Sequence, residues 1–299
     1  MKIITVSITI FLFSSKCFSQ NVQDDSVVIL KTVDEEPHQV QEYNFFANIG
    51  NNLSEQAQAP FKISNEQAMW IGGGAVVTIT LITLDQKIDN VFSPLDRHYR
   101  FVRRTSPQLT EFGGFRGIVA TGAFGLYSII WNDKRAQHTT LLITEALITS
   151  GIWTRIGKMI FSRERPSASY EFSHQQGGEW HWFTGYFKQG FETPAQWDAF
   201  PSGHTATAFA IASVVSEEYS DYALVAPIAY TIASGVGVTR LIEHAHWASD
   251  VFAGGVIGYL CGKQVARQHD KICHPGEIDT NVSLGVINDQ PALQFSLKF

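Results

Sequence analysis

Six apolar segments, separated by polar stretches, dominate the pattern of hydrophobic and polar positions along this chain of 299 residues. They are rich in Ala, Gly, Ile, Leu and Thr, and small residues at such close spacing are typical of tightly packed helices. The six segments are residues 70–84, 114–131, 139–156, 204–215, 222–238 and 247–265. The pattern therefore predicts an all-α fold, a bundle of about six apolar helices within residues 67–270.

Polar stretches flank the predicted bundle. Residues 20–66 contain acidic patches and form a lead-in, whose first half we expect to be flexible. In the tail, 271–299, apolar and polar residues alternate on both sides of residues 288–291, which is typical of a β-hairpin. We expect a short C-terminal hairpin that docks against the helices.

A long polar loop between Pro166 and Pro201 is unusually aromatic. Its aromatic residues are Tyr170, Phe172, Trp180, Trp182, Phe183, Tyr186, Phe187, Phe191 and Trp197. Loops of this length are generally functional or disordered, and this many aromatic residues argues against disorder. Two interpretations stay open: a small packing subdomain, or a lid or rim for a substrate.

Residues 1–19 have the features of a secretory signal peptide. Lys2 supplies a positive start, and the apolar run 3–13 is of signal-peptide length but short for a bilayer span. Small residues precede Gln20, where we expect cleavage. The signal predicts export to the periplasm or cell envelope.

Composition narrows the class of protein. Charged residues make up 17% of the chain, below the roughly 25% usual for soluble domains, and 44% of residues are hydrophobic. With a formal net charge of −6, nothing in the composition indicates the basic surface that a nucleic-acid-binding protein needs. We expect no nucleic-acid partner.

Three clusters of polar residues lie at the ends of the last four apolar segments. They contain Lys158, Arg165 and Pro166; Pro201, Ser202, Gly203 and His204; and Arg240, His246 and Asp250. If neighbouring segments run up and down, the end of the third, the start of the fourth, the end of the fifth and the start of the sixth meet. All three clusters then line one pocket at one end of the bundle.

Three cations in one pocket suit a phosphate, because its oxygens need several donors at once. Arg165 and Arg240 can each bind two oxygens with a planar guanidinium, and Lys158 adds a third charge. Ser202 and Gly203 precede a helix whose N-terminus favours negative charge.

The two histidines suit phosphoryl transfer. His246 and Asp250 are four residues apart, so they share one face if the sixth helix begins near His246. A carboxylate on one ring nitrogen fixes the tautomer and leaves the other nitrogen free to attack. His204 is then the natural general acid for the leaving oxygen.

Each signal also has a purely structural interpretation. A lone arginine at a helix end usually caps carbonyl groups, and a lone His–Asp pair is often structural. His244 and His246 suggest a metal site, but residues two apart on a helix point to nearly opposite sides, so they are poor joint ligands. It is the convergence of the clusters that favours a catalytic site without a metal.

The spacing of these residues resembles the three-part signature of the type 2 phosphatidic acid phosphatase and vanadium haloperoxidase superfamily. The signature is Lys158, six residues, Arg165-Pro166; Pro201-Ser202-Gly203-His204; and Arg240, five residues, His246, three residues, Asp250. The resemblance covers about residues 139–265. One departure is Thr239, where the family usually has serine, but a hydroxyl is retained.

The resemblance implies a role for each matching residue. Phosphate would be held by Lys158, Arg165, Ser202, Gly203 and Arg240. His246 would form a phospho-histidine, Asp250 would orient it, and His204 would protonate the leaving group. The phosphatases of the family need no metal or other cofactor, so none is expected here.

The resemblance implies a metal-independent phosphatase acting on phosphate monoesters or diphosphates, with a phosphorylated lipid as the expected partner. Candidate lipids are phosphatidic acid, phosphatidylglycerol phosphate, polyprenyl diphosphate and lipid A. The alternatives are a soluble periplasmic acid phosphatase and a vanadium-dependent haloperoxidase, although haloperoxidase chains are usually much longer. A non-enzymatic envelope scaffold is a further alternative, but every signature position is present.

The relation to the membrane is ambiguous in the sequence. Several apolar segments are short for spans, and Glu145 lies inside the third. A signal peptide followed by six spans would put the site in the cytoplasm, and Arg97, Arg100, Arg103 and Arg104 at the same end would also favour that side. Both inferences contradict the family's usual orientation. We therefore expect a periplasmic bundle resting on a membrane surface rather than an integral protein, with these arginines attracting an anionic headgroup.

Overall fold

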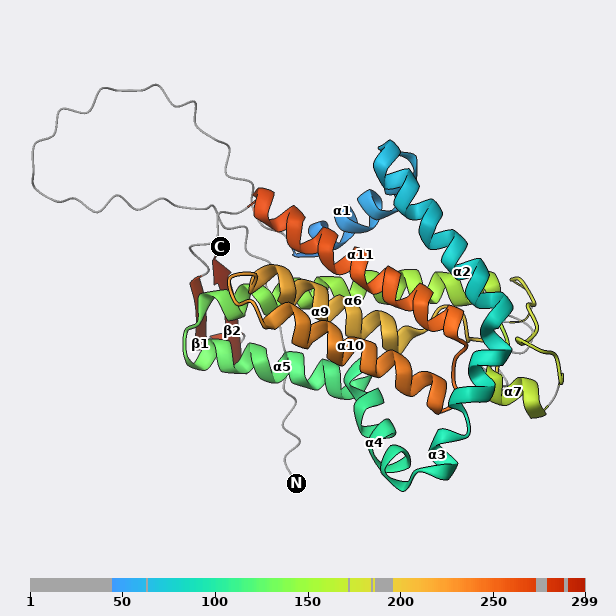
Figure 1. Cartoon of the computed structure of the whole chain (residues 1–299). Helices are drawn as coiled ribbons and strands as arrows, with labels where there is room; N and C mark the ends of the chain where they lie inside the picture. The colour runs from blue at the N-terminus through green and yellow to red at the C-terminus, as the bar shows by residue number, and fades with distance from the viewer. Residues whose placement is uncertain are drawn as a thin grey trace, which may run out of the picture.

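The computed structural model describes residues 45–62, 64–171, 173–183, 185, 196–272, 279–287 and 290–298. Four helices form its centre: α6 (Lys134–Phe161), α9 (Gly203–Glu218), α10 (Val225–Ile242) and α11 (Ala248–Ile272). The helix α9 packs against the other three, and the four run up and down beside one another (Figure 1). This arrangement brings the end of α6, the start of α9, the end of α10 and the start of α11 to one end of the bundle.

Further helices surround this centre. The helix α5 (Phe115–Ile130) packs on α6, and α2 (Asn65–Phe92) crosses α11 near the start of that helix (Figure 1). The helix α4 (Arg100–Thr110) packs against α10. The shorter elements are α1 (Phe45–Gln58), η1 (Ala59–Phe61), α3 (Leu95–His98), η2 (Glu111–Gly113) and α7 (Pro166–Glu171).

The mostly helical fold predicted from the sequence is confirmed, and each of the six apolar segments coincides largely with one helix. The hydrophobic pattern missed α1, α3, α4 and α7, because these helices are short or strongly polar. In α1, for example, the buried Asn52 donates a hydrogen bond to the buried Glu145 of α6 at 3.1 Å. The carboxylate of Glu145 therefore sits inside the apolar bundle with a polar partner.

Several predicted features lie wholly or partly outside the described residues. They include the signal peptide, the first half of the lead-in, and Phe172, Tyr186, Phe187 and Phe191 of the aromatic loop. In the tail, β1 (Asp279–Ile287) and β2 (Gln290–Lys298) pair antiparallel, with Asp279 opposite Lys298. That a hairpin docks against the helices stays a prediction.

Local sequence explains where α6 begins and why it ends at the site. Asp133 caps the helix, because its carboxylate accepts a hydrogen bond from the Ala136 backbone N–H at 3.0 Å. The helix stops at Ser162, whose left-handed backbone (φ 41°) turns the chain. Pro166 then begins α7, and proline is favoured at a first helical position.

The helices α9 and α11 approach each other unusually closely. A Cβ atom added at Gly258 would lie 2.1 Å from the carbonyl oxygen of Ala206, and one at Gly254 would lie 2.3 Å from that of Ser202. Next to this contact, Leu142 and Ala146 of α6 pack with Val214 of α9 in the core. Glycine on α11 thus lets the two helices that begin at the site pack backbone against backbone.

Large apolar side chains cover much of the outer surface. They include Val76 and Ile79 on α2, Ile118 on α5, and Ile228 and Ile232 on α10, all exposed. Two helical stretches, Ile71–His98 and Val225–Ile242, are long and apolar enough to cross a membrane, and only 6% of the apolar window in the first is buried. An outer surface of this kind suggests association with a membrane.

We expect Gly258→Ala to lower the stability of the fold by about 1–3 kcal/mol, because the added methyl group must push α11 away from Ala206. The matched control is Gly72→Ala in α2, where nothing lies within 4 Å and alanine favours the helix by up to about 1 kcal/mol. Thermal unfolding of the two variants measures the difference. Equal midpoints would show that α9 and α11 are not in close contact.

Candidate active site

The three polar clusters meet at the end of the bundle where α6 and α10 end and α9 and α11 begin (Figure 1). Backbone hydrogen bonds tie the clusters together: the Ser202 N–H donates to the carbonyl of Asp250 at 3.0 Å. The side chains of Lys158, Arg165 and Arg240 are all close enough to His246 to lower its pKa. The structure thus brings the predicted residues into one site.

His246 lies in the turn between α10 and α11 and is only 1% exposed. Its Nδ1 is 2.7 Å from the carbonyl oxygen of Ala199. A carbonyl can only accept, so Nδ1 carries the proton and Nε2 keeps its lone pair. Burial, followed by the charges of Arg165 and Lys158, holds the pKa of His246 well below its usual value. The ring is therefore neutral, as a nucleophile must be.

The hydrogen bond expected between His246 and Asp250 is replaced by the one to Ala199. Asp250 Oδ2 is 3.7 Å from His246 Nδ1, too long for a hydrogen bond. The same oxygen accepts from the backbone N–H of Trp247 at 2.7 Å. The carboxylate therefore fixes the turn that carries His246 and lies close to the ring without a hydrogen bond to it.

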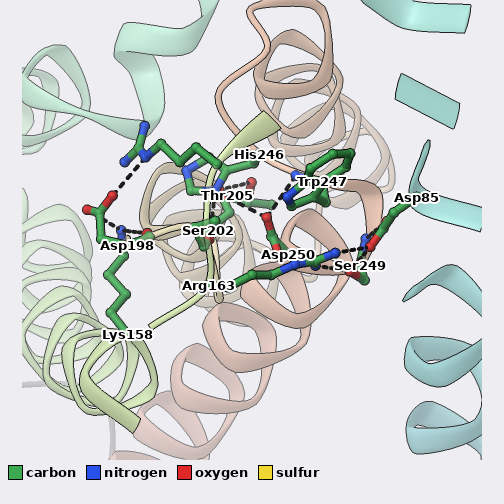
Figure 2. Close-up of polar contacts among 12 residues, drawn as sticks. Asp85, Lys158, Arg163, Asp198, Ser202, Thr205, His246, Trp247, Ser249 and Asp250 are labelled. Atoms are coloured by element: carbon green, nitrogen blue, oxygen red, sulfur yellow. Dashed lines mark hydrogen bonds and ion pairs between the residues drawn. The ribbon is translucent and has the colours of Figure 1, made fainter. Parts of the chain in front are cut away.

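Asp250 is held in turn by Arg163, which is completely buried. Its guanidinium donates to Asp250 Oδ1 and to Asp85 Oδ2, each at 2.6 Å, and also to the hydroxyl of Ser249. Asp85 comes from α2, more than seventy positions earlier in the chain, and also accepts from the Ser249 N–H at 2.9 Å. Figure 2 shows Arg163 lying between Asp250 and Asp85.

The aromatic loop contributes to this same network. The ring of Trp180 lies 4.5 Å from the Arg163 guanidinium carbon, and the ring of Trp247 lies 5.3 Å from it. Trp180 also packs against Phe161 and Phe200. This part of the loop thus supports the packing interpretation, whereas Trp182 and Phe183 are exposed and suit a rim.

Two of the predicted phosphate-binding cations share a carboxylate that the sequence analysis missed. Asp198 accepts from Lys158 Nζ at 3.0 Å and from Arg165 Nε at 2.7 Å (Figure 2). Burial alone would raise the pKa of Asp198, but Lys158 and Arg165 outweigh that effect and lower the pKa to about 2. The carboxylate is thus ionised, contacts both cations and offsets one of their two positive charges.

Arg240 is held by a second acidic residue. Its Nη1 donates to Glu243 Oε2 at 2.6 Å, while its buried Nε has no hydrogen-bond partner among the described residues. The Thr239 hydroxyl, which departs from the family's serine, accepts from Thr110 at 2.6 Å and donates to a backbone carbonyl. Arg240 therefore keeps a donor for an anion, and Thr239 anchors α10 to α4.

His204, Gly203 and Ser202 form the start of α9. Ser202 is completely buried and its Oγ accepts from Thr205 at 2.9 Å, while Gly203 opens the helix. Burial, followed by the charges of Arg240 and Lys158, lowers the pKa of His204 to about 4. The ring is thus neutral until an anion enters the site and raises its pKa.

The turn before α5 packs directly on His204. A Cβ atom added at Gly114 would lie 2.9 Å from His204 Nε2, and one at Gly113 would lie 2.3 Å from its carbonyl oxygen. This turn borders the site, and none of the three motifs contains it. Glycine is required at both positions by the space available rather than by any chemistry.

His244 takes no part in a metal site with His246. Its Nδ1 faces Asp89 of α2 at 3.2 Å, whereas His246 faces Ala199. Within the described ranges, no group of three or more His, Cys, Asp or Glu residues could hold a metal ion.

The sequence can now be compared with known proteins. The model of the PAP2 superfamily matches residues 139–272. A lipid A 1-phosphatase of Porphyromonas gingivalis is 45% identical over 67 residues, which make up 22% of this chain and 15% of that protein. The superfamily predicted from the three motifs is thus confirmed for this segment.

Two solved structures are similar to the chain. The crystal structure of Aquifex aeolicus LpxE has 21% sequence identity over 62% of this chain and 95% of that chain, with a TM-score of 0.46. That of the transmembrane PAP2-type phosphatidylglycerolphosphate phosphatase from Bacillus subtilis has 19% identity over 67% and 96% of the two chains, also with a TM-score of 0.46.

We expect Asp85→Asn to lower kcat about tenfold or more with a smaller change in KM. The variant removes one charge from the network that holds Asp250, and small displacements of a reacting group are costly, while the phosphate-binding cations stay in place. The control is Asp221→Asn, which breaks an exposed pair with Arg135 far from the site. The measurement is steady-state kinetics with a soluble phosphate ester, on protein shown to be folded. Equal kcat values for both variants would exclude a positioning role for Asp85.

The depressed pKa of His204 makes stability depend on pH. Between pH 6.5 and about 4 the unfolded chain binds a proton at this residue and the folded chain does not. Above pH 6.5 the titration of His204 therefore does not change the free energy of unfolding. As the pH falls from 6.5 towards 4, the free energy of unfolding falls with it. We expect the unfolding midpoint of His204→Gln to fall less than that of the wild type across this window; superimposable profiles would contradict the assignment.

Proposed function

Residues 139–272 belong to the PAP2 superfamily, and on this basis we propose that the chain is a phosphatase that hydrolyses a phosphate monoester or diphosphate of a lipid. One observation carries the proposal. The neutral His246, with an unprotonated Nε2, lies within the electrostatic field of Lys158, Arg165 and Arg240. A nucleophile and a binding site for a phosphate dianion thus coincide.

In the first step the phosphate binds to the three cations, and His246 Nε2 attacks phosphorus. The N–P bond forms as the bond from phosphorus to the leaving oxygen breaks, and His204 supplies the proton that this oxygen needs. The charge that develops on the His246 ring is stabilised at Nδ1–H by the carbonyl of Ala199. The bound phosphate raises the pKa of His204, so the acid is protonated when it is needed.

In the second step water attacks the phospho-histidine. His204, now without its proton, accepts one from the water as the new O–P bond forms and the N–P bond breaks. His246 recovers its lone pair and inorganic phosphate leaves. Every proton that His204 gives in the first step returns in the second, so the cycle balances without a metal.

A lipid substrate is supported by the outer surface of the molecule. The apolar side chains exposed on α2, α5 and α10 would be poorly hydrated in a soluble acid phosphatase and suit contact with lipid chains. The similar lipid A 1-phosphatase of Porphyromonas gingivalis also acts on a phosphorylated lipid, as its name states. We place the enzyme in the cell envelope, associated with a membrane through these helices, after removal of the predicted signal peptide.

The intermediate provides the direct test. Protein mixed with a lipid phosphate labelled in its phosphorus and quenched in alkali should carry label that is lost in acid, as expected for phospho-histidine. His246→Ala should carry none and should turn over at least about 1000-fold more slowly, because the nucleophile is gone.

The matched control is His244→Ala, two residues away and facing Asp89. It should retain both label and turnover. Label on the His246→Ala protein, or equal turnover by it and the wild type, would refute the phospho-histidine mechanism.

A further inference from the structure

Five exposed arginines gather in one segment between α2 and α5. We call residues 95–116, which comprise α3, α4, η2 and the start of α5, the basic collar. Its arginines are Arg97, Arg100, Arg103, Arg104 and Arg116. The segment has only two acidic residues, Asp96 and Glu111, both partly buried. The collar is thus basic on a chain whose formal net charge is −6.

These arginines are not used within the fold. In the part of the chain that the structure describes, none of the five forms an ion pair with a carboxylate, and Arg116 contacts only the carbonyl of Gln108, at 3.4 Å. By contrast, every arginine at the catalytic centre has an acidic partner: Arg163, Arg165 and Arg240. The charge of the collar is therefore available to a partner outside the molecule.

Exposed aromatic side chains accompany the arginines. Phe101 is 77% exposed, Phe115 71% and Tyr99 59%. Aromatic rings beside basic residues, at the end of helices with apolar outer surfaces, are typical of the boundary between lipid chains and headgroups. The apolar face of α2 leads directly to the collar (Figure 1).

The collar borders the catalytic site. Gly114 packs on the ring of His204, and the hydroxyls of Ser106 and Thr110 donate hydrogen bonds to Glu243, the partner of Arg240. Three separate points of the collar thus lie next to residues of the active-site end. Whatever binds the collar is held beside the entrance to the site.

We propose that the basic collar binds the acidic headgroups of phospholipids and so holds the active-site end against an anionic membrane surface. Its charge, its aromatic residues and its place at the end of the apolar surface all match that occupant. This binding needs no hydrolysis, so it stands or falls independently of the proposed function. A lipid such as phosphatidylglycerol offers the required charge without being a phosphate monoester.

The experiment measures binding of two lipids to the full-length chain in a nonionic detergent. The probes are tail-labelled phosphatidylglycerol and tail-labelled phosphatidylcholine, which differ in headgroup charge. The wild type should prefer phosphatidylglycerol, and 0.5 M NaCl should abolish the preference because it screens exposed charges. Without a preference at low salt, the proposal is overturned whatever the variants do.

The variant Arg100→Gln/Arg103→Gln/Arg104→Gln should weaken phosphatidylglycerol binding at least tenfold, since each arginine near an anionic surface contributes about fivefold in affinity. Its phosphatidylcholine binding should not change. The control is Arg267→Gln, an exposed arginine near the far end of α11, which should bind like the wild type. Thermal unfolding establishes that each variant is folded. If the triple variant does not fold, the three single Arg→Gln variants are measured in its place.

Two results would overturn the proposal. One is a triple variant that keeps the preference for phosphatidylglycerol, which would leave the arginines only the role of setting membrane orientation. The other is an equal loss in Arg267→Gln, which would make the effect one of total charge. Phe101→Ser supplies a separate reading: it should weaken binding of both lipids to a similar extent, because it removes apolar contact and no charge.

Discussion

The burial of Arg163 is the constraint on which the rest of the site depends. A guanidinium cannot be deprotonated inside a protein, so its complete burial requires carboxylates on more than one side. Asp85 and Asp250 meet this requirement from α2 and α11, and Trp180 and Trp247 cover the remaining faces. Removal of Arg163 would leave two buried carboxylates without the cation that they share. The geometry around His246 is therefore fixed by a charge that never meets the substrate.

The cations around His246 act on both histidines, but a neutral ring suits the proposed role of only one of them. Burial first, and then the charges of Lys158, Arg165 and Arg240, lower the pKa of both rings and keep them neutral, which suits a nucleophile but not an acid. A bound phosphate dianion changes this balance, because it lies among the same cations and offsets their field. In the proposed mechanism, His204 then takes up a proton only in the presence of the group whose departure it assists. The acid is thus prepared by the substrate, and no separate conformational change is needed to switch it on.

The sequence predicted the helical segments and the meeting of the motifs, because both follow from the spacing of apolar and polar residues along the chain. It could not reveal contacts between residues that only the folded chain brings together. Asp198 lies in the aromatic loop with no motif around it, and Ala199 contributes only a backbone carbonyl, which no residue type reveals. Arg163 stood inside the first motif, and Asp85 stood at the edge of an apolar segment; a carboxylate at such a place is the signal that could have paired them. The helix α4 escaped because its polar residues hide the face that packs on α10, and α3 escaped because it has only 4 residues.

Asp198 has a consequence for the end of each catalytic cycle. Lys158 and Arg165 hold this carboxylate when no phosphate is present, so neither cation is left bare. In the proposed mechanism, a departing phosphate therefore leaves less uncompensated positive charge behind, because Asp198 offsets one of the two charges. Product affinity would be lower than at bare cations, because a bound phosphate must compete with Asp198 for Lys158 and Arg165. If the proposed function holds, Asp198 thus reduces inhibition of the site by the inorganic phosphate that the reaction releases.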